Sequence, residues 1–71
     1  MMTIDSCNAV LRIWGMTHFR TLDSGASLWM DRDGNPHRVP NLAPLSLEER
    51  RDLMQQMAER IGEVLPAEAA A

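Results

Sequence analysis

The stretch from Leu45 to Pro66 constrains the fold most, because it has the features of one complete amphipathic helix. Ser46 and Glu49 have the spacing of a capping box, in which each side chain accepts a hydrogen bond from the other residue's backbone amide. Gly62 is expected to weaken the last turn, and Pro66 to end the helix. One side of this helix would be an apolar stripe wide enough to cover a small sheet. The stripe comprises Leu47, Leu53, Met54, Met57, Ala58, Ile61, Val64 and Leu65.

The N-terminal half of the chain has two strong turn signals, Ser24-Gly25 and Asp33-Gly34. Dipeptides of this kind favour two-residue turns with positive φ, which suit the twist of a β-hairpin. The runs on either side of the turns are short and β-like. The sequence therefore predicts an antiparallel meander of three strands, formed by residues 18–23, 26–32 and 35–39.

The register of these hairpins decides which side chains face the helix. With two-residue turns, the face towards the helix carries Phe19, Leu28, Met30 and Val39. The outward face then carries a row of three side chains, Arg20, Trp29 and Arg38. A three-residue loop with a glycine bulge at Gly34 is the alternative; it would move Arg38 beside Leu28, since a shift of one residue exchanges the two faces of a strand.

Residues 7–14 fit two kinds of element. Cys7, Ala9, Leu11 and Ile13 alternate as in a strand, whereas Val10, Ile13, Trp14 and Thr17 have helical spacing, with Asp5 or Ser6 as a cap. We favour the strand because the segment is short and β-branched residues are frequent in it. A translational start at Met16 would make residues 1–15 dispensable.

The predicted fold class is α+β. A small antiparallel β-meander of three strands, or four if residues 7–14 join it, has the amphipathic C-terminal helix packed on one face. Residues 1–66 form a single domain, and the Ala-rich tail 67–71 is expected to fray or be disordered. A chain of 71 residues buries a limited core and is marginally stable alone. With one cysteine it forms no internal disulfide, so self-association or a protein partner is the remaining source of stability.

Signals of catalysis, metal binding and cofactor binding are weak. Asp31 to Asn35 resembles the start of a calcium loop, but the positions for the loop glycine and glutamate hold Pro36 and Leu42. Cys7, His18 and His37 are far apart in sequence, and the predicted register places the two histidines on opposite faces. No P-loop, nucleophile elbow or GxGxxG motif is present. We therefore expect no enzyme activity, no metal and no cofactor.

The candidate binding residues are arginine and tryptophan, the types most enriched in interface hot spots. The outward row of Arg20, Trp29 and Arg38 is the first candidate surface, because guanidinium groups stack on an indole. Trp14 is either a core residue or an exposed edge residue. Arg50 lies inside the apolar arc of the helix, where it either extends to solvent or pairs with an acid such as Asp31.

These observations predict a non-catalytic protein-binding module, of the kind found among small bacterial or phage regulators and inhibitors that dock on a larger complex. One alternative is an obligate homodimer. The other is single-stranded nucleic-acid binding through Trp29 and its arginines, which the net charge of −3 disfavours. An early Asp5 and the interruption by Arg12 do not fit a signal peptide, and the free cysteine fits the cytoplasm, with no membrane association.

Overall fold

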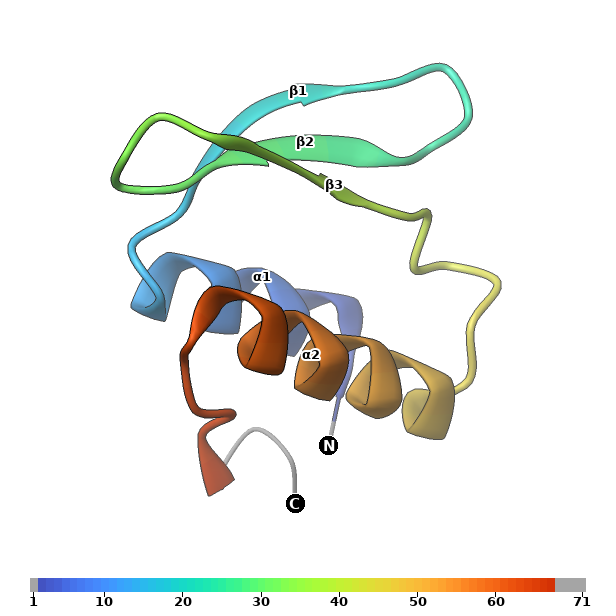
Figure 1. The fold of residues 1–71 in the computed structure, drawn as a ribbon. Helices are drawn as coiled ribbons and strands as arrows, with labels where there is room; N and C mark the ends of the chain where they lie inside the picture. Colours follow the sequence, from blue (N-terminus) through green and yellow to red (C-terminus); the bar gives the residue numbers. More distant parts are fainter. Residues whose placement is uncertain (1, 68–71) are drawn as a thin grey trace.

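The computed structural model describes residues 2–67, which form two layers. Two helices, α1 (Ile4–Ile13) and α2 (Leu47–Ile61), lie on one side of a sheet, as Figure 1 shows. The sheet has three antiparallel strands in the order β1 (Thr17–Thr21), β2 (Ser27–Met30) and β3 (Pro36–Val39). The α+β class and the three-stranded meander are confirmed, whereas the predicted tail, apart from Ala67, lies outside the described residues.

The prediction of a strand over residues 7–14 is wrong, because this segment lies in α1. Thr3 caps the helix, its hydroxyl accepting from the Ser6 amide at 3.1 Å. Cys7, Val10 and Leu11 have the i, i+3, i+4 spacing of one helix face and are all buried. This segment therefore contributes to the core, and a chain that began at Met16 would lack these three buried side chains.

Both hairpins close with three-residue loops instead of the predicted two-residue turns. In the first, the Leu22 amide donates to the Ala26 carbonyl at 2.7 Å, and Gly25 has a φ of 89°. In the second, the Asp31 amide donates to the Asn35 carbonyl at 2.9 Å, and Gly34 has a φ of 83°. In each loop the third residue is a glycine with a left-handed backbone. For the second hairpin, this is the alternative three-residue loop with a bulge at Gly34.

Each longer loop shifts the register between β2 and the neighbouring strand by one residue relative to the prediction. Leu28 lies opposite Arg20 and Arg38, and Trp29 lies opposite His18 and His37. An irregularity between His18 and Arg20 gives β1 an extra residue at Phe19. Trp29 therefore faces the helices and Leu28 faces away from them, the reverse of the predicted arrangement.

The helix found within the predicted stretch 45–66 begins as expected and ends earlier. Its capping box is confirmed: the Glu49 amide donates to the Ser46 hydroxyl at 3.1 Å, and the Ser46 amide to the Glu49 carboxylate at 2.9 Å. The helix stops at Gly62, whose φ of 76° is left-handed, and not at Pro66. Glycine at this position ends a helix readily because it carries no Cβ. Val64, predicted in the apolar stripe, consequently lies beyond the helix and is 81% exposed.

The core lies between the sheet and the two helices. It combines buried side chains from α1, α2, β2, β3 and the connecting segments. Its members are Met2, Cys7, Val10, Leu11, Trp14, Met16, Trp29, Val39, Leu42, Met54, Met57 and Ala58. Neither helix of the described residues has the length and apolarity needed to span a bilayer.

The capping box gives a direct test of where α2 begins. Replacing Ser46 by alanine removes the acceptor for the Glu49 amide, and we expect the free energy of unfolding to fall by about 1 kcal/mol. Chemical denaturation monitored by circular dichroism measures the change. Ser24→Ala, in the first hairpin loop, is a control for the loss of a serine hydroxyl outside a helix, where the hydroxyl accepts a long bond of 3.4 Å from the Ala26 amide. An unfolding free energy equal to that of the wild type in Ser46→Ala would contradict the cap.

Candidate functional site

The side of the sheet that faces away from the helices carries an amphipathic row. Arg20, Leu28 and Arg38 lie side by side on the three strands, with Leu28 in the centre. Both arginines are exposed and Leu28 is half-buried. Phe19, at the irregularity in β1, is 63% exposed. The two arginines are thus neighbours across the central strand, as predicted, but the residue between them is leucine.

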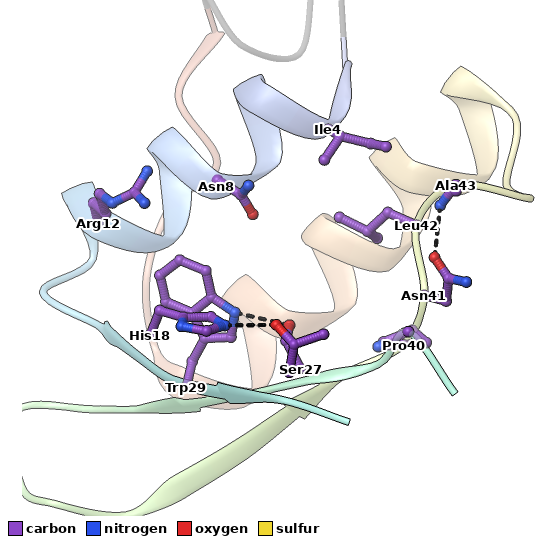
Figure 2. A pocket seen from close by; sticks show the side chains of 12 residues that line it. Ile4, Asn8, Arg12, His18, Ser27, Trp29, Pro40, Asn41, Leu42 and Ala43 are labelled. Atoms are coloured by element: carbon purple, nitrogen blue, oxygen red, sulfur yellow. Dashed lines mark hydrogen bonds between the residues drawn. The ribbon is translucent and has the colours of Figure 1, made fainter. Parts of the chain in front are cut away.

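Trp29, predicted in that outward row, is a core residue with an exposed fraction of 2%. The Arg12 guanidinium lies over its ring, 5.6 Å from the centroid, and the His18 ring meets it edge-on at 5.3 Å. Its indole N–H donates to the Ser27 hydroxyl at 3.0 Å (Figure 2). The side chain is therefore packed and hydrogen-bonded inside the protein, and it offers no surface on which a nucleic-acid base could stack.

A groove of about 240 Å³ opens between α1 and the inner side of the β1–β2 hairpin. Ile4, Asn8 and Arg12 line it from α1, one helical turn apart, and Figure 2 shows the Asn8 amide directed towards the sheet. The segment that follows β3 closes one end. The other lining residues are His18, Thr21, Gly25, Ser27, Trp29, Pro40, Asn41, Leu42 and Ala43.

The two remaining predicted site residues have structural roles. Trp14 is 4% exposed, which confirms its interpretation as a core residue, and its indole N–H donates to the Val64 carbonyl at 3.1 Å. Arg50 donates to the carbonyl oxygens of Leu42 at 2.9 Å, Ala43 at 3.4 Å and Met2 at 3.5 Å. Arg50 therefore neither extends freely to solvent nor pairs with Asp31. It connects α2 to the segment before α1 and to the segment before α2 through their backbone carbonyl oxygens.

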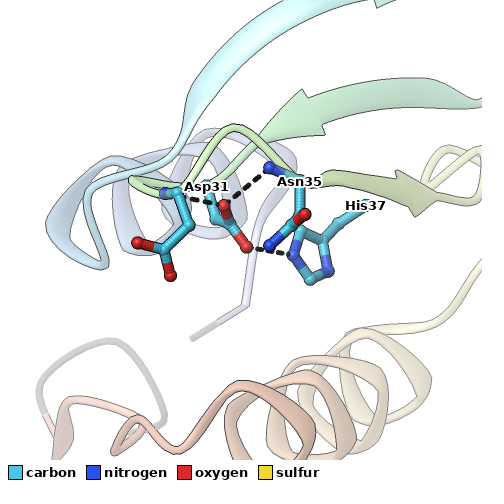
Figure 3. A network of polar contacts seen from close by, with 4 residues as sticks. Asp31, Asn35 and His37 are labelled. Atoms are coloured by element: carbon cyan, nitrogen blue, oxygen red, sulfur yellow. Dashed lines mark hydrogen bonds and ion pairs between the residues drawn. The ribbon is translucent and has the colours of Figure 1, made fainter.

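Asp31 organises the second hairpin loop, as Figure 3 shows. Its Oδ1 accepts from the amides of Asp33 and Asn35, each at 2.9 Å, and its Oδ2 lies 2.8 Å from Nε2 of His37. The bond to His37, followed by the amide of Asn35, lowers the pKa of the Asp31 carboxyl. Each of these bonds favours the ionised form, so the contacts hold the loop most strongly when Asp31 is charged.

The thiol and the histidines do not form a catalytic arrangement. Cys7 is fully buried, and burial raises the pKa of its thiol, which opposes formation of the nucleophilic thiolate. His18 bonds to the Thr21 hydroxyl at 3.0 Å, and His37 bonds to Asp31. Contrary to prediction, both histidines share the inner side of the sheet, where they lie on either side of Trp29. Within residues 2–67, no three potential ligands gather as a metal site.

The sequence does not predict the groove, because its pattern favours a strand for residues 7–14, which belong to the helix that forms one wall of the groove. Ile4, Asn8 and Arg12 would share one side in a strand as well, but a strand would spread them over roughly 26 Å, whereas the helix brings them within roughly 12 Å of one another. The helical spacing of Cys7, Val10 and Leu11 was the available signal. No comparable signal in the sequence places β2 and the segment 40–43 beside that helix.

Replacing Trp29 by alanine tests its burial. We expect the unfolding free energy to fall by about 3–5 kcal/mol, because the change leaves a large cavity in the core. Thermal unfolding followed by circular dichroism would then show a strongly lowered Tm. Phe19→Ala is the control, because this aromatic side chain is 63% exposed, and it should change stability by less than about 0.5 kcal/mol. Similar Tm values for Trp29→Ala and the wild type would place the indole outside the core.

The lowered pKa of Asp31 predicts a pH dependence of stability. Its carboxyl has a lower pKa in the folded protein than in the unfolded chain, so its contribution is complete above the ordinary aspartate value of about 3.9. The contribution is lost as the pH falls through that value towards the folded pKa. Asp31→Asn should therefore lower Tm at pH 7 and reduce the fall in Tm between about pH 5 and pH 2.5.

Asp33→Asn is the control, because the Asp31 carboxylate bonds to the backbone amide of residue 33 and not to its side chain. Glu49, whose pKa is lowered by its bonds to Ser46, contributes in the same direction and remains in both variants. A Tm profile of Asp31→Asn parallel to that of Asp33→Asn would contradict the role of Asp31.

Comparison of the chain with protein-family models, curated proteins and solved structures found no match.

Proposed function

We propose that this protein is a non-catalytic binding module that docks on a larger protein through the open side of its sheet. The docking surface consists of Phe19, Arg20, Leu28, Met30 and Arg38. The observation that carries the proposal is the row in which two exposed arginines flank Leu28 on the side of the sheet that the helices leave uncovered (Figure 1).

The chemistry of this surface favours a partner that is apolar at its centre and acidic at its edges. Leu28 and Met30 are half-buried and Phe19 is largely exposed, so the surface offers apolar area that a partner can remove from water. Arg20 and Arg38 are absent from both ion pairs found among residues 2–67. Guanidinium groups in this position match carboxylates in a planar, bidentate geometry. An acidic segment bearing apolar side chains satisfies both requirements.

Two observations support a binding role over catalysis or nucleic-acid recognition. Cys7 is buried with a raised pKa, so it is not an activated nucleophile. Trp29 is enclosed by Arg12, His18 and Ser27, so the proposed base-stacking residue is inside the protein. A small regulator or inhibitor of a larger complex fits the docking surface, and a homodimer formed through the same surface is the alternative.

Charge reversal on this surface tests the proposal. A tagged Arg20→Glu/Arg38→Glu variant should capture at least about tenfold less of the partner than the wild type, because two acids replace the groups that pair with the partner's carboxylates. Capture from native cytoplasm after brief cross-linking, with quantitative mass spectrometry, measures this loss. Higher salt should weaken capture by the wild type, since exposed charges are screened.

Arg51→Glu/Arg60→Glu is the matched control, because it makes the same change in net charge on α2, away from the docking surface. Equal capture by the two double variants, with both folded by circular dichroism, would contradict docking through the open sheet side. Recovery of only the tagged protein and its untagged copy would favour the homodimer, and sedimentation equilibrium would then show a dimer that the Arg20/Arg38 variant disrupts.

A further inference from the structure

The groove between α1 and the β1–β2 hairpin has two chemically different ends. Arg12 and His18 lie at one end, and Ile4 and Leu42 lie at the other, as Figure 2 shows. Ile4 and Arg12 are eight residues apart on α1, which corresponds to roughly 12 Å along the helix axis. A ligand lying along the groove would therefore contact cationic and polar groups at one end and apolar groups at the other.

The polar end is suited to an anion. None of the lining residues is acidic, although the chain has 10 acidic residues. Arg12 is exposed and its guanidinium lies over the Trp29 ring, and neither ion pair of the described residues includes it. The Asn8 amide on α1 and the Thr21 and Ser27 hydroxyls on the sheet are neutral hydrogen-bonding groups that line the groove. The Thr21 hydroxyl also bonds to His18, and the Ser27 hydroxyl also accepts from the Trp29 indole. A single guanidinium beside neutral donors matches one carboxylate group.

The volume of the groove indicates how much of a ligand it can cover. About 240 Å³ corresponds to about eight water molecules at roughly 30 Å³ each, which is smaller than the usual site of a drug-sized molecule. A carboxylate with a chain of about six carbons fills such a space. Its apolar part would lie against Ile4, Pro40 and Leu42, and its carboxylate would lie near Arg12.

The geometry points to a binding site for a short-chain organic carboxylate in this groove. Recognition has two parts: Arg12 pairs with the carboxylate, and the segment 40–43 with Ile4 covers the aliphatic chain. The groove is on the inner side of the sheet and the proposed docking surface is on the outer side, so the two proposals rest on different residues and can fail separately.

Hexanoate is the probe, and the two indole N–H groups report on its binding by ¹H–¹⁵N NMR. The Trp29 indole lines the groove and bonds to Ser27, whereas the Trp14 indole bonds to Val64 elsewhere. We expect hexanoate to shift the Trp29 signal in a saturable way and to leave the Trp14 signal unchanged. Acetate lacks the chain and 1-hexanol lacks the charge, so each should bind at least tenfold more weakly. Inorganic phosphate should give no saturable shift.

Variants separate the carboxylate site from general binding of an apolar anion. Arg12→Gln should weaken hexanoate binding at least tenfold, and Asn8→Leu should weaken it by narrowing the groove and removing an amide. Arg51→Gln removes an exposed arginine outside the groove and should bind as the wild type does, and so should Arg20→Glu/Arg38→Glu. The inference is overturned if hexanol binds as well as hexanoate, if both indole signals shift together, or if both Arg12→Gln and Asn8→Leu, folded by circular dichroism, retain wild-type affinity.

Discussion

The burial of Trp29 determines which side of each strand faces the helices. This side chain is in the central strand, and its ring lies against Arg12 of α1 and His18 of β1. Because side chains alternate along a strand, an inward Trp29 requires an outward Leu28 and an outward Met30. The composition of the open sheet side, and therefore the proposed docking surface, follows from this one placement.

Buried tryptophans also need a hydrogen-bond acceptor for the indole N–H, and both Trp29 and Trp14 have one. The Trp29 N–H bonds to Ser27 two residues earlier, which fixes the ring along its own strand. The Trp14 N–H bonds to the Val64 carbonyl, which holds the segment after α2 against the end of α1. Arg50 acts similarly: it donates to the Leu42 and Ala43 carbonyls in the segment before α2 and to the Met2 carbonyl before α1. A small chain without a disulfide thus uses long-range hydrogen bonds to fix its connections.

The elements with strong local signals could be predicted from the sequence, and those fixed by tertiary contacts could not. Ser46 and Glu49 determine the start of α2 by hydrogen bonds within one turn, so their spacing in the sequence is enough to predict where the helix begins. The sequence predicts that Gly62 weakens the last turn of the helix, and only its left-handed backbone shows that the helix ends there. The hairpins were located from Gly25 and Gly34, yet each loop was one residue longer than predicted, and that residue reversed the facing of β2.

Because residues 4–13 form a helix, this one short segment contributes side chains both to the core and to the wall of the groove. Cys7, Val10 and Leu11 point into the core, while Ile4 and Arg12 lie along the groove. A strand has only two sides and would direct alternate residues to each, whereas a helix distributes its side chains around a cylinder. Both helices are used to cover the inner side of the sheet, so within residues 2–67 no further element is left to cover the outer side (Figure 1). The open amphipathic side is thus a direct consequence of placing α1 and α2 in one layer, and it leaves Phe19, beside Arg20, 63% exposed.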